Sequence, residues 1–182
     1  MAVVHDHASQ DDTSKEQKAL AAALVHDLGK GTTPRTEWPR HRGHEERSVS
    51  LIEALADRLR LPAEYRDLGI IVARYHGNVH RAFQLRPNTI LEFIERADAF
   101  RRPERFALAL LACEADARGR TGLEHVPYPQ RAYLQAARDA AAAIKPSAED
   151  IAAHSGAKIA ERLHQRRAQV IAELREHSGV RQ

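Results

Sequence analysis

The stretch Leu24-Val25-His26-Asp27-Leu28-Gly29-Lys30 places a histidine beside an aspartate at the end of an alanine-rich segment. Adjacent residues on an α-helix point about 100° apart, so His26 and Asp27 can serve one site only with a ligand between them. Imidazole nitrogen and carboxylate oxygen together suit a divalent metal such as Fe, Mn, Zn, Co or Ni. Gly29 predicts the end of the helix. The alternative is a pair of ordinary surface residues near a helix end.

Length and composition favour one well-packed domain with a helical appendage in this chain of 182 residues. Lysine and arginine exceed aspartate and glutamate by 28 to 25, which gives a formal net charge of +3. The single cysteine, Cys113, excludes an internal disulfide framework and is typical of a reducing cytosol. No apolar run reaches the roughly 20 residues that span a bilayer, and no signal-peptide pattern is present. We therefore expect a cytoplasmic protein without membrane contact.

Helical periodicity recurs along the whole chain, and strand-like alternation is absent. The capping box Thr13-x-x-Glu16 is expected to open the first helix. Leu20 and Leu24 then share one helical face with Asp27. This pattern predicts a core-facing aspartate, whose carboxylate is costly to bury unless it is paired or bound to a metal.

Prolines, glycines and caps divide the rest of the chain into further helices. These are expected over about 44–60, 62–75, 87–98, 103–118 and 129–144, briefly after Ser147, and over 157–176. In the helix that begins at Pro87, Asp98 ends an apolar stripe, as Asp27 does in the first helix. We predict an all-α fold.

Polar residues at core-facing or helix-end positions form a candidate metal site. They are His26, Asp27, His44, His76, His80 and Asp98. Helical bundles build metal sites from histidines and carboxylates that project inward from several helices. A metal held in this way lowers the pKa of bound water and polarises a phosphoryl oxygen. Lys30 directly follows the histidine–aspartate pair and is placed to hold a phosphate.

Several longer motifs carry a family resemblance. They are HDLGKGTTP at 26–34, EWPRH at 37–41, GHE at 43–45, RDL at 66–68, DAFRRP at 98–103 and EADARGRTG at 114–122. These motifs resemble the C-terminal HD domain of bacterial CCA-adding enzymes, which are tRNA nucleotidyltransferases, within the HD-domain metal-dependent phosphohydrolases. The resemblance implies a helical HD domain over residues 1–122, followed by a C-terminal helical extension over 123–182 that packs on it.

The resemblance also implies roles for individual residues. A divalent metal (Ni, Mn, Co or Mg) is expected on His26, Asp27 and Asp98. The expected catalytic group is Asp27, Lys30, His44 and His76. The candidate contacts to substrate phosphate or RNA are Lys30, Arg40, Arg118 and Arg120. For Asp116, Arg118 and Arg120 the alternative is an ion-paired helix end.

Two exposed features allow a structural or a functional interpretation. Trp38 is expected to pack its loop over the site, with stacking on a nucleic-acid base as the alternative. An arginine face on the last helix is either solvated or a contact to a phosphate backbone. Its members are Arg162, Arg166, Arg167 and Arg175.

The implied activities are metal-dependent 2′,3′-cyclic phosphodiesterase, 2′-nucleotidase and phosphatase, with tRNA 3′ ends or nucleotide phosphates as partners. A nucleotidyltransferase head and a second copy of the chain are further candidate partners. The chain has no signature of that head, so we expect a fragment or split gene product that does not add CCA alone. Counting back from His26 to the first histidine of such sites reaches the start of the chain, and His5 and His7 are candidates to replace it. The alternative function is a tRNA-binding or dimerisation module without turnover.

Overall fold

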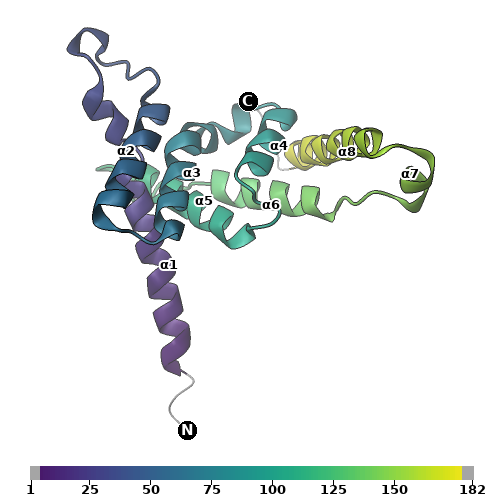
Figure 1. Cartoon of the computed structure of the whole chain (residues 1–182), viewed down its shortest axis with the longest axis horizontal. Helices are drawn as coiled ribbons and strands as arrows, with labels where there is room; N and C mark the ends of the chain where they lie inside the picture. The colour runs from purple at the N-terminus through teal and green to yellow at the C-terminus, as the bar shows by residue number, and fades with distance from the viewer. Residues whose placement is uncertain (1–4, 178–182) are drawn as a thin grey trace. The chain divides into compact units, whose positions relative to one another are not determined.

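The protein is all-α in the computed structural model, which describes residues 5–177. Its α-helices are α1 (His5–Val25), α2 (His44–Leu59), α3 (Ala63–His80), α4 (Pro87–Arg96), α5 (Pro103–Arg118), α6 (Gln130–Ala143), α7 (Ala148–Ala153) and α8 (Gly156–His177) (Figure 1). Short 3₁₀ helices are η1 (Leu28–Thr32), η2 (Arg35–Glu37) and η3 (Ala82–Gln84). No strand occurs among the described residues, which confirms the predicted class. None of the helices described here combines the length and the apolar character needed to cross a bilayer.

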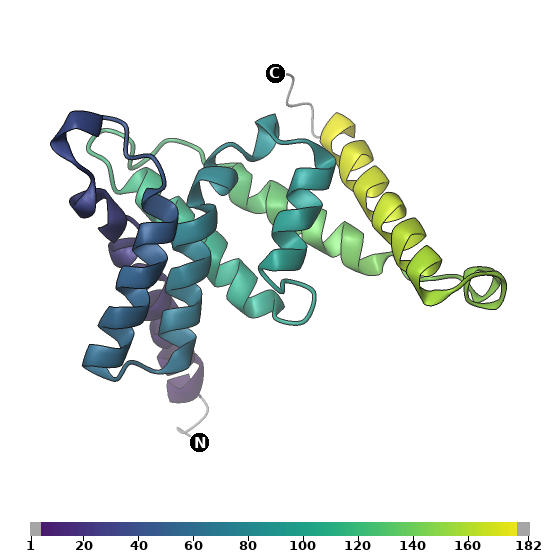
Figure 2. The same ribbon diagram turned by 45° about the horizontal axis from the view of Figure 1, so that its top comes forward.

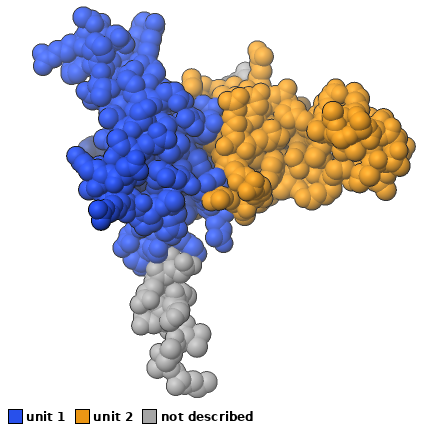
Figure 3. Space-filling view, in the orientation of Figure 1, with its two compact units in different colours: residues 1–80, 104–128 blue, residues 81–103, 129–182 orange. Residues whose placement is uncertain are grey.

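The chain divides into two compact units, coloured separately in Figure 3. Unit 1 comprises residues 1–80 and 104–128, and unit 2 comprises residues 81–103 and 129–182. The boundary expected at residue 122 would place residues 81–103 in the first domain. By contacts they group with the later helices, because α4 packs against α6 and α8, and the boundary at residue 122 stays a prediction. The buried side chains of α4 are Ile90, Leu91, Phe93 and Ile94.

In unit 1, helix α3 packs against both α1 and α2, and the three helices lie side by side (Figures 1 and 2). A small core of Val49, Ile52 and Ala73 is closed by the partly buried Val25. Gly69 permits the close approach, because a Cβ there would lie 3.3 Å from side-chain carbons of both Ile52 and Val25. This packing holds the end of α1 beside α2.

Helix α1 begins at His5, ahead of the predicted capping box. Thr13 therefore lies inside the helix, and the prediction that it opens the helix is wrong. The polar residues before Thr13 continue the helix, because polar side chains alone do not end an α-helix. The side chains of His5 and His7, the candidate replacement ligands, lie outside the described residues.

The buried face of α1 also differs from the predicted one. Leu20 and Leu24 are 57% and 73% exposed, whereas Ala19 and Ala22 are each 2% exposed. Small alanine side chains let α1 lie close to α3, so they take the packed face and the larger leucines do not. His26 continues the alanine face and is 5% exposed. The helical face that enters the interior therefore carries the histidine, not the aspartate.

In unit 2, the arginine face of α8 contacts the protein itself. Arg162 and Arg166 both bind the Asp150 carboxylate, at 2.7 and 2.8 Å. Arg167 and Arg175 each donate to a backbone carbonyl oxygen, at 3.1 Å in both cases. These contacts give the face a structural role in joining α8 to its neighbours.

Candidate metal centre

The end of α1, the start of α2 and the end of α3 bring four of the predicted site residues together in unit 1. Asp27 lies among three histidine rings. Its Oδ2 is 3.2 Å from Nε2 of His26. Its Oδ1 is 3.3 Å from Nε2 of His44 and 3.8 Å from Nε2 of His76. Three histidines, one just beyond the end of α1 and one each from α2 and α3, thus surround one carboxylate.

Gly29 sets the path of the chain just after this carboxylate. Its N–H donates to Oγ of Ser48 at 2.9 Å. A Cβ at position 29 would lie 2.2 Å from the carbonyl oxygen of His44 and 2.7 Å from the backbone nitrogen of Ser48. Glycine is therefore required for close contact between η1 and α2. It is not the left-handed helix cap that the sequence suggested, because α1 ends earlier, at Val25.

Backbone carbonyl groups orient all three histidine rings. Nδ1 of His26, His44 and His76 lies 2.6, 2.8 and 3.0 Å, respectively, from the carbonyl oxygen three residues earlier. A carbonyl oxygen only accepts, so each Nδ1 carries the proton. Each Nε2 then keeps its lone pair directed toward Asp27. Histidine ligands of metals are commonly held by such an outer contact.

The unpaired atoms at this site test whether a metal fits. Nε2 of His26, Oδ1 of Asp27 and Nε2 of His44 are buried and make no hydrogen bond within the described part of the chain. Such atoms are costly unless a ligand satisfies them. Ligand atoms of His26, Asp27 and His76 all lie within 4.8 Å of one another. The residues present therefore fit a divalent ion.

The charges of the site favour an ionised Asp27 and a neutral His76. Burial raises the pKa of Asp27, but the neighbouring His26 and the hydrogen bond from Lys30 outweigh it and hold this pKa well below its usual range. Burial lowers the pKa of His76, and the neighbouring His26 lowers it further. Burial also opposes protonation of His26, yet the adjacent Asp27 carboxylate leaves its pKa raised, so a metal at His26 would compete with a proton. The site therefore offers an ionised carboxylate and a neutral His76, as a metal needs.

Asp116 on α5 is a carboxylate that sequence reasoning did not assign to the metal. Its Oδ1 lies 3.8 Å from Nε2 of His26, and its Oδ2 lies 3.0 Å from Nε2 of His80. The hydrogen bond to His80 is the main reason that the pKa of Asp116 is lowered. The signal that could have found it is helical spacing, because Asp116 follows the buried Ala112 and Cys113 by one turn.

The predicted ligand Asp98 lies in unit 2, just beyond the end of α4. Its backbone is left-handed, with φ of 54°. Its carboxylate oxygens are each 3.6 Å from a guanidinium nitrogen, of Arg101 and of Arg102. The helix ends before Asp98, so the residue does not continue the apolar stripe as predicted. Its role as a metal ligand stays a prediction.

The residues predicted to contact phosphate or RNA lie on different segments of unit 1. Lys30 Nζ lies 2.5 Å from Oδ2 of Asp27, at the edge of the site. Arg40 is exposed in the loop between η2 and α2. Arg118, the last residue of α5, and Arg120, two residues beyond it, form ion pairs with acidic residues of α5 four positions earlier, at 2.9 and 3.5 Å. The ion-paired helix end considered as an alternative is thus present.

A helical fold in which the His26–Asp27 pair meets His44 and His76 agrees with the comparison of the sequence with known families. The HD domain family matches residues 2–118. The chain belongs to this family, and the resemblance inferred from the motifs is confirmed.

The chain is similar to one part of larger bacterial proteins. It is 56% identical over 160 residues to the multifunctional CCA protein of Thioalkalivibrio sulfidiphilus, and 54% identical over 158 residues to that of Nitrosococcus oceani. Each match covers 87% of this chain and 39% of the relative. The multifunctional CCA protein of Hahella chejuensis is 42% identical over 166 residues, which are 91% of this chain and 39% of that protein. The chain thus spans about two fifths of the length of these relatives. No solved structure gives a match.

Proposed function

We propose that the chain is a metal-dependent phosphohydrolase that acts on 2′,3′-cyclic phosphodiesters, 2′-nucleotides and phosphomonoesters at tRNA 3′ ends. The observation that carries this proposal is the set of buried, unpaired ligand atoms on His26, Asp27 and His44. A site with unsatisfied nitrogen and oxygen ligands favours a divalent cation over a purely structural role. The similarity to multifunctional CCA proteins supports the choice of substrate class.

In this proposal the metal ligands come from unit 1. His26, Asp27 and His76 would hold the ion, with Asp116 beside His26. A bound divalent ion there would supply Lewis acidity toward a phosphoryl oxygen and lower the pKa of water. Asp98 remains a candidate ligand from the sequence.

Three further residues would act on the substrate or on the attacking water. Lys30 has a side chain that is 39% exposed, so its Nζ can turn from Asp27 to a substrate phosphate and hold it as a point charge. Nε2 of His44 would accept a proton from the attacking water, because Nδ1 of the ring already donates to a carbonyl oxygen. Arg40, at the surface of the adjoining loop, would contact the substrate backbone.

The proposed partners and setting follow from the same relatives. Because the chain spans 39% of their length, we infer that the remaining part of such proteins carries the nucleotidyltransferase head and that this chain alone adds no CCA. A separate head chain, the tRNA 3′ end and a second copy of this chain are the proposed partners, and the cytoplasm is the proposed location.

One observation favours a second function. The ion pair between Lys30 and Asp27 neutralises the central carboxylate without any metal. A site closed in this way would support a tRNA-binding or dimerisation module that lacks turnover. The two functions differ in whether a metal binds at Asp27.

Hydrolysis of 2′,3′-cAMP by the purified chain, with Ni²⁺, Mn²⁺, Co²⁺ or Mg²⁺ added, tests the proposal. We expect metal-dependent turnover that falls at least about 100-fold in Asp27→Ala, because this variant removes a direct ligand. The matched control is Asp57→Ala, which removes an exposed aspartate from α2. Wild-type protein without turnover under any of these metals would contradict the phosphohydrolase and leave the binding module.

A further inference from the structure

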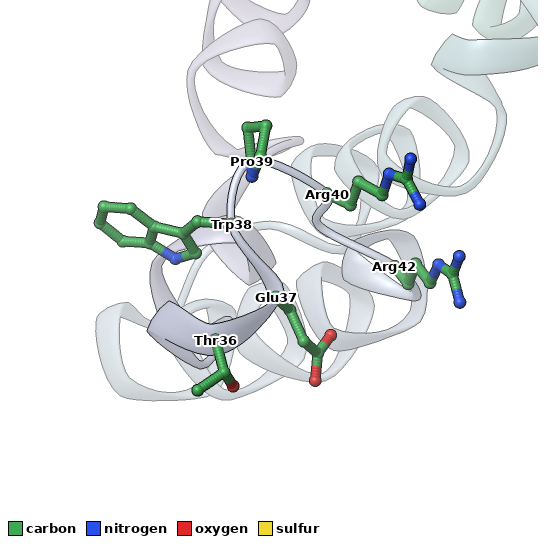
Figure 4. A pocket seen from close by; sticks show the side chains of 6 residues that line it. All are labelled: Thr36, Glu37, Trp38, Pro39, Arg40 and Arg42. Carbon is green, nitrogen blue, oxygen red and sulfur yellow. The ribbon is translucent and has the colours of Figure 1, made fainter.

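A second candidate site of unit 1 lies in the loop that joins η2 to α2. It is a pocket of about 640 Å³ (Figure 4). Its lining residues are Thr36, Glu37, Trp38, Pro39, Arg40 and Arg42. Of these residues only Arg40 has a role in the proposed function, so the other side chains of the pocket need a separate account.

Trp38 presents an aromatic ring to solvent in a fixed orientation. It is the single tryptophan of the chain, and it is 59% exposed. Its Nε1–H donates to the carbonyl oxygen of Thr33 at 3.2 Å, which anchors the indole at one edge. The faces of an aromatic ring held in this way are available for stacking at little cost in side-chain entropy.

Arg40 and Arg42 place two positive charges on the opposite edge of the pocket from Trp38 (Figure 4). Both side chains are exposed, and neither guanidinium group forms an ion pair within the described part of the chain. This distinguishes them from Arg66, Arg74 and Arg118, which are paired with carboxylates. Uncompensated guanidinium groups bind phosphate oxygens through paired hydrogen bonds.

The same loop is attached to the metal centre by hydrogen bonds. Oγ1 of Thr33 contacts Nδ1 of His41 at 3.0 Å and accepts from Arg47 at 2.8 Å. Arg47 also donates to the carbonyl oxygen of Arg42 at 2.8 Å. The carbonyl oxygen of His41 in turn holds Nδ1 of His44 at 2.8 Å. The segment that forms the pocket therefore also orients a ring of the metal centre.

We propose that this pocket binds single-stranded RNA nucleotides adjoining the phosphate that is hydrolysed. One unstacked base lies on the ring of Trp38, and backbone phosphates contact Arg40 and Arg42. The bases of a duplex are already stacked on each other, so an aromatic platform of this kind selects single strands. The inference rests on the proposed function, since it assigns the metal centre to the reacting end of such a strand.

The fluorescence of the single tryptophan gives a direct test that needs no turnover. The probe is a short adenosine oligoribonucleotide with a 2′,3′-cyclic phosphate end, titrated into the whole chain. We expect quenching of Trp38 by the single strand, and little quenching by the same strand in a blunt-ended duplex or by inorganic phosphate. Equal quenching by all three probes, or none by the single strand, would overturn the proposal.

Variants then separate stacking from charge, with binding followed by anisotropy of a labelled strand. Trp38→Ala should weaken binding about tenfold or more, and Trp38→Phe should restore much of it, because a stacked base contributes substantially to the binding free energy.

Arg40→Gln with Arg42→Gln should reduce the slope of log K against log salt by about 0.7 for each phosphate that is no longer neutralised. Arg58→Gln, an exposed arginine of α2, is the matched control and should change neither quantity. Unchanged affinity in both pocket variants, folded as judged by circular dichroism, would contradict the assignment.

Failure of this inference can be told apart from failure of the proposed function. If the phosphohydrolase is correct and the pocket is not, wild-type protein hydrolyses 2′,3′-cAMP and Trp38→Ala does not change its preference for the oligonucleotide. If the pocket is correct and the phosphohydrolase is not, the strand quenches Trp38 and no metal supports hydrolysis. With both correct, the ratio of kcat/KM for the oligonucleotide to that for 2′,3′-cAMP falls about tenfold in Trp38→Ala.

Discussion

Asp27 has two carboxylate oxygens with different neighbours. Oδ2 is held by Lys30 at 2.5 Å and lies 3.2 Å from His26. Oδ1 has no hydrogen-bond partner among the described residues and lies between His44 and His76. A cation can therefore approach Oδ1 while Lys30 still holds Oδ2, so one carboxylate can contact both a metal and Lys30.

A residue-scale prediction concerns the second carboxylate of the centre. We expect Asp116→Asn to weaken Mn²⁺ affinity at least about tenfold, because Asp116 lies 3.8 Å from Nε2 of His26 and has a lowered pKa. Isothermal titration calorimetry measures the effect. Asp98→Asn is the comparison, and a similar loss there would confirm the ligand predicted from sequence. Unchanged affinity in Asp116→Asn would exclude Asp116 from the centre.

Gly29 supports a second prediction at this scale. Gly29→Ala should destabilise the protein by about 3 kcal/mol or more, because the new Cβ would meet backbone atoms of His44 and Ser48 rather than a flexible side chain. Gly31→Ala is the matched control, since no other atom lies within 4 Å of a Cβ at that position. Urea unfolding compares the two. Equal free energies of unfolding for both variants would show that η1 moves away from α2 at little cost.

At the scale of elements, α1 packs through its smallest side chains. Ala22→Leu should lower the free energy of unfolding by about 1–3 kcal/mol, because Ala22 is 2% exposed against α3. Leu24→Ala should change it by less than about 0.5 kcal/mol, because Leu24 is 73% exposed. Thermal or urea unfolding gives both values. A larger loss of stability in Leu24→Ala than in Ala22→Leu would indicate that the leucine face predicted from the sequence is the buried one.

The junction of α7 and α8 predicts a dependence on pH. Hydrogen bonds from Ser147, followed by those from Arg162, lower the pKa of Asp150 from 3.8 to about 2. Because the folded pKa lies below the unfolded one, the ionised carboxylate stabilises the fold above about pH 4, and this contribution is lost as pH falls toward 2. The difference in urea midpoint between wild type and Asp150→Asn should therefore shrink across that range. If the difference in urea midpoint stayed constant across this pH range, the charge of Asp150 would not be the cause of the difference.

At the scale of the whole molecule, metal binding and folding should be linked. A ligand that binds only the folded state stabilises it by about 2.7 kcal/mol at a concentration 100 times its Kd. We expect Mn²⁺ to raise the midpoint of thermal unfolding in wild type but not in Asp27→Asn, with a chelator reversing the shift. Asp57→Asn should respond as wild type does. A shift of equal size in Asp27→Asn would place the ion elsewhere.

Much of the molecule could be predicted from local sequence. The helices, the breaker-rich loop before α2 and the positions of His26, His44 and His76 near helix ends follow from patterns that act over a few residues. The helical class is determined in the same way, because periodic apolar positions need a common interior. The motif around Asp27 also indicated the family correctly.

Other features depended on contacts between segments far apart in the sequence. The exposed leucines of α1 resemble a core stripe until α3 is seen to pack on Ala19 and Ala22. Asp98 and Asp116 both follow apolar helical residues, and only the folded chain places Asp116 beside His26. The sequence by itself therefore determined the helices, the family and the central carboxylate. Tertiary structure decided which helical faces are buried and which second carboxylate meets His26, because these depend on how closely two backbones approach.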